Sequence, residues 1–162
     1  MHDYYSHRYW IMWLSFLCTI MLQIIPCPEQ FLLFRPSWLL LVMIYWILTF
    51  PSRINIGTGF IIGLIADLLY RSTLGIHALA FSMIAYLIAK KYYQFNSCLL
   101  WQQALLVIGL SWIMDVIIFL SEYFLIHVIF YPAHIWSSII NGILWPWIRS
   151  FMRKICHKFS IR

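Results

Sequence analysis

The chain has 162 residues, of which 64% are hydrophobic and 10% are charged, against roughly 45–50% and 25% in an ordinary soluble domain. A soluble fold of this length has no interior large enough for so much apolar surface, and the composition is too apolar for disorder. The net charge of +6 needs no nucleic acid, because no fold expected here presents a site for one. The composition therefore predicts an integral membrane protein.

Apolar runs that approach the roughly 20 residues of a spanning helix recur along the chain. The first run ends before Pro26 and Pro28, and the second ends before Pro51. The fifth lies within a stretch, Leu99–Ile126, that is longer than one span requires. We expect an all-α membrane protein, a single domain built as one bundle of about six transmembrane helices, at residues 9–25, 31–50, 54–69, 75–89, 99–122 and 134–147.

The positions of Lys and Arg predict the orientation, because cytoplasmic loops carry an excess of both. Six spans place most of the basic residues on one side of the bilayer, including those of an expected basic tail at 149–162, and leave only two on the other. The first side holds Arg8, Arg53, Lys90 and Lys91 with the tail, and the second holds Arg35 and Arg71. We therefore expect both termini in the cytoplasm, and we interpret the basic tail as a topology signal or as a contact with anionic lipid.

Cysteine and histidine give no sign of a metal site. The four cysteines and six histidines show none of the spacings that metal ligands or a disulfide framework favour. An enzyme needs a nucleophile, or a base with an orienting group, and the sequence displays neither. We expect no metal, no cofactor and no catalytic residues.

Ionisable residues inside the expected spans carry the most information, because a charge in hydrocarbon needs a partner or water. Asp67 lies late in the third span, Asp115 inside the fifth and Arg35 near the start of the second. At 1.5 Å per residue, all three fall in the outer half of the bilayer, so we expect Arg35 to pair with Asp67 or Asp115. Other polar residues predicted at this level are His77, Glu122 and Asn141.

A stripe of small residues shares a helix face with one of these charges. Gly59, Gly63 and Asp67 are spaced by four residues, and glycines at this spacing let two helices approach closely. We expect the stripe to pack inside the chain, against the second or the fifth helix.

Three interpretations of the outer polar cluster remain open, in order of preference: structural hydrogen bonding, a cavity or partner-docking surface, and a proton or ion pathway.

Several longer runs, taken in order and with their spacing, resemble the MreD family of rod shape-determining proteins from Gram-negative bacteria. The resemblance covers essentially the whole chain and is weakest over the first eight residues and after Lys154. The matching runs are FRPSW at 34–38, YWIL at 45–48, PSRINIGTGF at 51–60, GLIADLL at 63–69, STLG at 72–75, LWQQAL at 100–105 and WSSIINGILWPW at 136–147.

The resemblance implies a non-enzymatic inner-membrane scaffold or regulator of the machinery that makes side-wall peptidoglycan and keeps cells rod-shaped. The partners that it implies are MreC, MreB acting through MreC, and RodA with its partner transpeptidase. It also implies a fold similar to the substrate-binding subunits of energy-coupling-factor transporters, which carries no transport function with it. The alternative is a transport subunit that binds a small molecule in an outward-facing cavity. A deep outer pocket lined by Trp and Tyr favours the alternative, and a filled core favours the scaffold.

Overall fold

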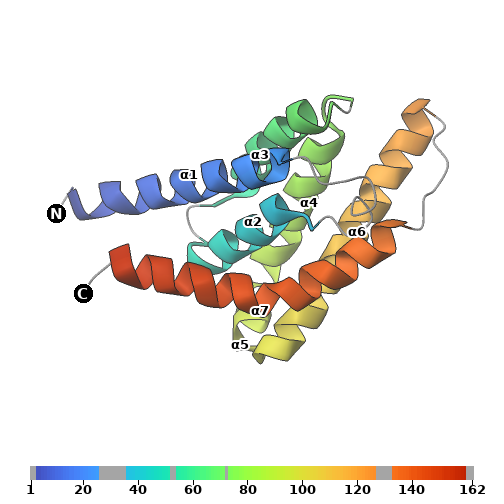
Figure 1. Ribbon diagram of the computed structural model, residues 1–162. Helices are drawn as coiled ribbons and strands as arrows, with labels where there is room; N and C mark the ends of the chain where they lie inside the picture. The colour runs from blue at the N-terminus through green and yellow to red at the C-terminus, as the bar shows by residue number, and fades with distance from the viewer. Residues whose placement is uncertain (1–2, 26–35, 52–53, 72, 127–132, 160–162) are drawn as a thin grey trace.

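The computed structural model describes residues 3–25, 36–51, 54–71, 73–126 and 133–159. All regular structure in these ranges is helical, which agrees with the predicted all-α class (Figure 1). The helices are α1 (Asp3–Ile24), α2 (Trp38–Thr49), α3 (Ile56–Tyr70), α4 (Ile76–Lys90), α5 (Tyr92–Ser97), α6 (Leu100–Ile126) and α7 (Ala133–Phe159).

The helices differ in whether they are long enough to cross a bilayer. Among those described, only α6 is clearly long and apolar enough, with a mean hydropathy of 2.3 over the most apolar 18-residue window within Leu100–Leu125. The helices α2, α3 and α4 have 12, 15 and 15 residues, or about 18–23 Å at 1.5 Å per residue, which is less than the roughly 30 Å of a hydrocarbon core. The expected span at 31–50 is therefore helical only over Trp38–Thr49 in its described part.

The ends of the chain depart furthest from the prediction. A helix ending at Trp147 and a basic tail at 149–162 were expected, but α7 continues to Phe159 with Pro146 inside it. A proline in a helix removes one backbone hydrogen bond and bends the helix without necessarily ending it, and Figure 1 shows α7 bent near its middle. The first helix also begins earlier than expected, at Asp3, and the unpredicted α5 connects the fourth and fifth expected spans.

The helix α2 forms the core of the bundle. Every residue from Leu39 to Leu48 is buried, and α2 contacts α1, α4, α5 and α7 (Figure 1). A helix that is apolar on all sides is covered either by protein or by lipid. The burial of Leu39–Leu48 within the chain shows that protein surrounds α2, which explains how so short a helix fits the bundle.

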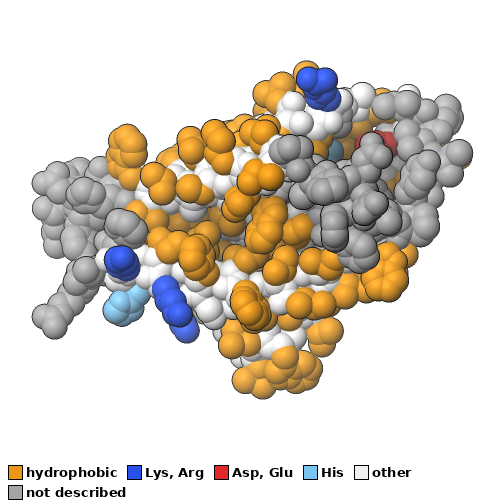
Figure 2. All heavy atoms as spheres, viewed as in Figure 1, with side chains coloured by type: hydrophobic (Ala, Val, Ile, Leu, Met, Phe, Trp, Pro, Cys, Tyr) orange, Lys and Arg blue, Asp and Glu red, His pale blue; other side chains and the backbone are white. Residues whose placement is uncertain are grey.

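The outer surface is strongly apolar. Only 17% of the most apolar window of α6 is buried inside the protein, and large side chains such as Trp112, Phe124 and Trp147 are exposed. Figure 2 shows hydrophobic side chains over most of the described surface. Soluble monomers rarely expose contiguous apolar patches of this extent, so this surface fits contact with lipid or with other apolar helices.

Successive long helices run in alternating directions, so that the bundle has two distinct ends. The ends of α1 and α3 meet where Gln23 donates a hydrogen bond to the hydroxyl of Tyr70; we call this the polar end. At the opposite end, Ile11, Phe50 and Asn96 line one cavity, and both chain termini lie toward this side in Figure 1. We call it the basic end because the basic residues of α7 lie there.

Candidate functional site

Asp67 lies near the end of α3, at the polar end, and its side chain is fully buried. Its carboxylate accepts hydrogen bonds from the backbone N–H groups of Gly75, His77 and Ala78, at 2.8, 3.0 and 3.3 Å. These donors belong to the first turn of α4, where helix N–H groups have no partner within the helix and the helix dipole favours an anion. Asp67 therefore caps α4 from the neighbouring helix.

The connection between α3 and α4 brings the cap into place. Arg71, at the end of α3, has φ 51°, and Gly75, just before α4, has φ 106°. Glycine adopts this left-handed conformation without a steric cost, whereas Arg71 tolerates it at a helix terminus. The resulting tight turn folds α4 back along α3 and points its N-terminus at Asp67.

Two further side chains complete what we call the Asp67 cluster. The Nδ1 atom of His77 lies 2.8 Å from Oδ1 of Asp67, and the rings of His77 and Tyr70 stack with centroids 5.0 Å apart. Gln23 reaches this stack through the Tyr70 hydroxyl. No base with an orienting group was expected from the sequence, whereas the structure places the His77 ring beside the Asp67 carboxylate. The carboxylate of this pair also caps α4, so the pair connects α3 to α4.

A second polar group, the Asn141 cluster, joins the start of α2 to α6 and α7. Oδ1 of Asn141 accepts a hydrogen bond from the backbone N–H of Ser37 at 2.9 Å, and its Nδ2 donates to Ser111 at 3.2 Å. The hydroxyl of Ser138 donates to Asp115 at 2.8 Å. Asn141, Ser111 and Ser138 are all buried, so these bonds satisfy groups that would be costly to leave unpaired.

The predicted outer residues therefore divide between two helix pairs. Asp67 belongs to the α3–α4 pair, Asp115 and Asn141 belong to the α6–α7 pair, and Glu122 lies partly exposed near the end of α6. Arg35 falls outside the described residues, so its pairing with Asp67 or Asp115 stays a prediction. From the sequence we expected the aspartates to accept hydrogen bonds or to pair with Arg35, but the helix N-terminus that supplies the donors to Asp67 was not identified.

The two glycines of the stripe face α4. A Cβ atom at Gly63 would lie 2.3 Å from the Cα atom of Ala78, and one at Gly59 would lie 3.0 Å from the Cβ atom of Ala85. The expectation of packing against the second or fifth helix is wrong about the partner. The turn between α3 and α4 is short, and helices joined by short connections pack as antiparallel neighbours.

Cavities among the described residues include three that the outer polar residues do not line. One of about 860 Å³ lies among α1, α2 and α7 and has a mostly apolar lining. A second, about 380 Å³, opens at the basic end, and a third, about 270 Å³, lies among α1, α2 and α3. The groups at the polar end are instead engaged in helix-to-helix hydrogen bonds.

These features define an all-α protein with an enclosed central helix and an apolar exterior, the class of a helical membrane protein. Comparison with known proteins gives its family. Residues 5–155 match the family model of rod shape-determining protein MreD. The chain is 38% identical over 158 residues to the rod shape-determining protein MreD of Haemophilus influenzae, across 95% of this chain and 98% of that protein. The chain belongs to the MreD family.

No solved structure matches the chain. The expected similarity to the substrate-binding subunits of energy-coupling-factor transporters therefore stays a prediction. The family and the apolar helices together indicate a membrane protein with a role in determining rod shape.

Proposed function

We propose that this protein is a non-enzymatic scaffold of the inner membrane that maintains rod shape by supporting side-wall peptidoglycan synthesis. The observation that carries this proposal is the match to MreD, which extends over residues 5–155 and includes a relative aligned along almost its whole length. The structure supports a scaffold because its buried polar groups join one helix to another. The transport alternative needs an outer cavity, and it has no comparable support.

The proposed partners are MreC, MreB acting through MreC, and RodA with its partner transpeptidase. The exposed apolar face of α6 supports membrane partners of this kind, because only 17% of its most apolar window is buried within the chain. In lipid, helices associate through close packing and hydrogen bonds. We further propose a multi-pass topology with both termini in the cytoplasm, since both ends of the chain lie toward one side of the bundle (Figure 1).

The experiment that tests the role in cell shape is depletion of this protein in the rod-shaped bacterium that carries it, followed by complementation. Depleted cells are expected to become round, and the wild-type chain is expected to restore rods. Complementation with Gly109→Ala, a change at a glycine with open space around it, is the matched control and should also restore rods. Rods that persist after depletion, in a strain without a second copy, would refute the proposal.

The proposed partners need a separate test. Crosslinking in native membranes followed by purification of the full-length chain is expected to recover MreC and RodA. The yield of each partner, divided by the yield of this protein, should be unchanged by Gly109→Ala. Recovery of neither partner from membranes in which all three proteins are present would contradict the proposed assembly while leaving the role in shape intact.

A further inference from the structure

The cavity at the basic end combines aromatic walls with positive charge. It lies among the N-terminal half of α1, the end of α2, α5 and the second half of α7, and its volume is about 380 Å³. Trp46 and Trp145 line its apolar side, and Arg149, Arg153 and His157 line its basic side. The three basic residues are spaced by four, so they share one face of α7.

The described lining of this cavity contains no acidic side chain. Among the acidic residues whose side chains are described, Asp67, Asp115 and Glu122 do not contribute a wall, and the Asp67–His77 pair lies at the polar end. The Nη1 atom of Arg149 is buried, and no described group accepts a hydrogen bond from it. A buried, charged donor without an acceptor is costly, so the site is built to receive an anion.

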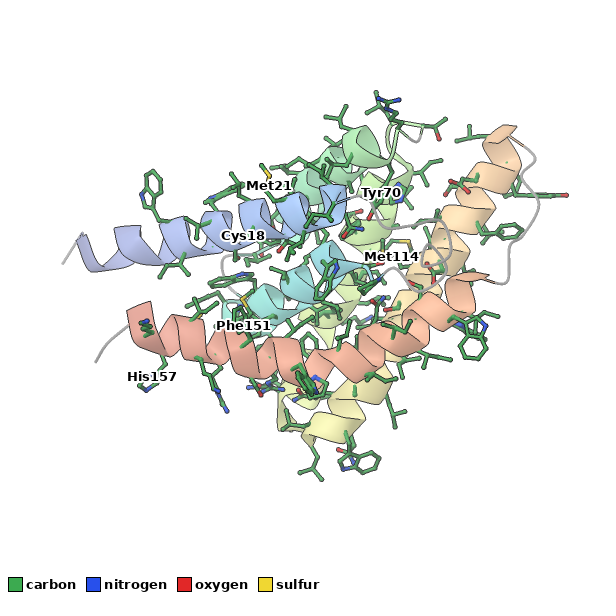
Figure 3. All side chains as sticks on the ribbon, in the orientation of Figure 1. Cys18, Met21, Tyr70, Met114, Phe151 and His157 are labelled. Atoms are coloured by element: carbon green, nitrogen blue, oxygen red, sulfur yellow. The ribbon has the colours of Figure 1, made fainter. Side chains whose placement is uncertain are left out.

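A long apolar groove begins beside the cavity. The groove of about 860 Å³ between α1 and α7 has α2 at its base, and Ile11 lines both the groove and the cavity. Cys18 of α1 and Phe151 of α7, labelled in Figure 3, contribute to its two walls. In Figure 2, Lys, Arg and His side chains gather at the end of the molecule beside this apolar surface. The cavity thus suits an anionic headgroup, and the adjoining groove suits an alkyl chain.

We propose that the basic-end cavity binds the phosphate headgroup of a membrane lipid, whose alkyl chain lies in the groove between α1 and α7. Arg149 and Arg153 supply the guanidinium groups, which pair with phosphate oxygens through two parallel hydrogen bonds. A soluble phosphate compound shares the headgroup chemistry, but only a lipid also uses the apolar groove. This site goes beyond the proposed scaffold function and does not depend on it.

The test measures lipid binding to the purified full-length protein in a zwitterionic detergent. Dioleoyl phosphatidylglycerol is titrated, and the fraction of protein that retains one lipid is followed by native mass spectrometry. Arg149→Gln and Arg153→Gln are each expected to weaken binding about tenfold. Lys154→Gln is the matched control, because Lys154 is exposed like Arg153, lies next to it on α7 and does not line the cavity. It should bind as the wild type does.

Inorganic phosphate serves as the soluble probe and is expected to displace the lipid only at a far higher concentration than a competing lipid. Thermal unfolding shows whether each variant is folded. Because Arg153 is exposed, Arg153→Gln still tests the site if Arg149→Gln does not fold. Equal weakening by Lys154→Gln, or unchanged binding in folded Arg153→Gln, would overturn the site. Phosphate that competes as well as the lipid would overturn the assignment to a lipid.

Discussion

The packing of Gly63 against α4 predicts a graded cost for adding a single methyl group to the glycine stripe. A Cβ atom at Gly63 would lie 2.3 Å from the Cα atom and 2.7 Å from the backbone N of Ala78, and 2.6 Å from the carbonyl O of His77. All three neighbours are backbone atoms and cannot rotate away. An ordinary contact begins near 3.4 Å, so Gly63→Ala requires α4 to move by about 1 Å.

The magnitude follows from what that movement disturbs. Overpacking of a filled interior costs roughly 1–3 kcal/mol. The same movement pulls the N-terminus of α4 away from Asp67, and each weakened hydrogen bond to a charged group contributes roughly 1.5–3 kcal/mol. We expect Gly63→Ala to lower the free energy of unfolding by about 2–5 kcal/mol, and Gly63→Leu to prevent accumulation of folded protein in membranes. At Gly59, where the nearest atoms lie at 3.0 and 3.1 Å, Gly59→Ala should cost less.

The assay is the yield of folded protein from membranes, together with thermal unfolding of the purified chain in detergent. Gly109→Ala is the matched control, because nothing lies within 4 Å of its added Cβ and alanine favours a helix by up to about 1 kcal/mol over glycine. The expected order of stability is Gly109→Ala, then Gly59→Ala, then Gly63→Ala. If Gly63→Leu accumulates and unfolds as the wild type does, the stripe is not an internal contact and the reasoning fails.

Three further predictions concern buried polar groups and topology. Asp67→Asn should lower the free energy of unfolding by about 2–4 kcal/mol in thermal unfolding, because an amide NH₂ then faces N–H donors; an unchanged melting temperature would contradict the cap. The Nε1 atom of Trp46 donates to Ser15 at 2.7 Å, so a double-mutant cycle of Trp46→Phe and Ser15→Ala should give a coupling energy of about 0.5–1.5 kcal/mol rather than zero. A reporter enzyme fused after Lys91 should be active in the cytoplasm and one fused after Thr73 in the periplasm; the opposite result would reverse the topology.

Composition and apolar runs predict the all-α class and most helix positions, because both depend on local sequence. The length of a helix in the core of the bundle depends instead on the helices packed around it. A run of apolar residues around α2 predicts a full span when lipid is assumed to surround it, whereas protein encloses it and the helix covers only Trp38–Thr49. The extension of α7 beyond Trp147 was missed because the basic residues from Arg149 onward were interpreted as a separate tail, whereas they continue the same helix.

The polar residues show where sequence reasoning about the site succeeds and where it stops. Because a polar or charged group inside the membrane is costly without a partner, Asp67, Asp115 and Asn141 were expected to have partners. The structure shows hydrogen bonds for each of them. The backbone donors to Asp67 were not predicted, because backbone N–H groups leave no mark in the sequence. The one available signal was the short turn ending at Gly75, which places the start of a helix within reach of Asp67.

The cap that Asp67 makes on α4 also determines how the α3–α4 hairpin can move. Three backbone N–H groups, of Gly75, His77 and Ala78, and the His77 ring lie within 2.8–3.3 Å of the two Asp67 oxygens, whereas one residue of a helix rises 1.5 Å along its axis. Sliding α4 along α3 by a single residue would break most of these bonds together. Apolar contacts with lipid resist sliding far less, so the axial register of this hairpin is set by the protein rather than by the bilayer. Any rearrangement of the bundle should therefore carry α3 and α4 together as one rigid unit.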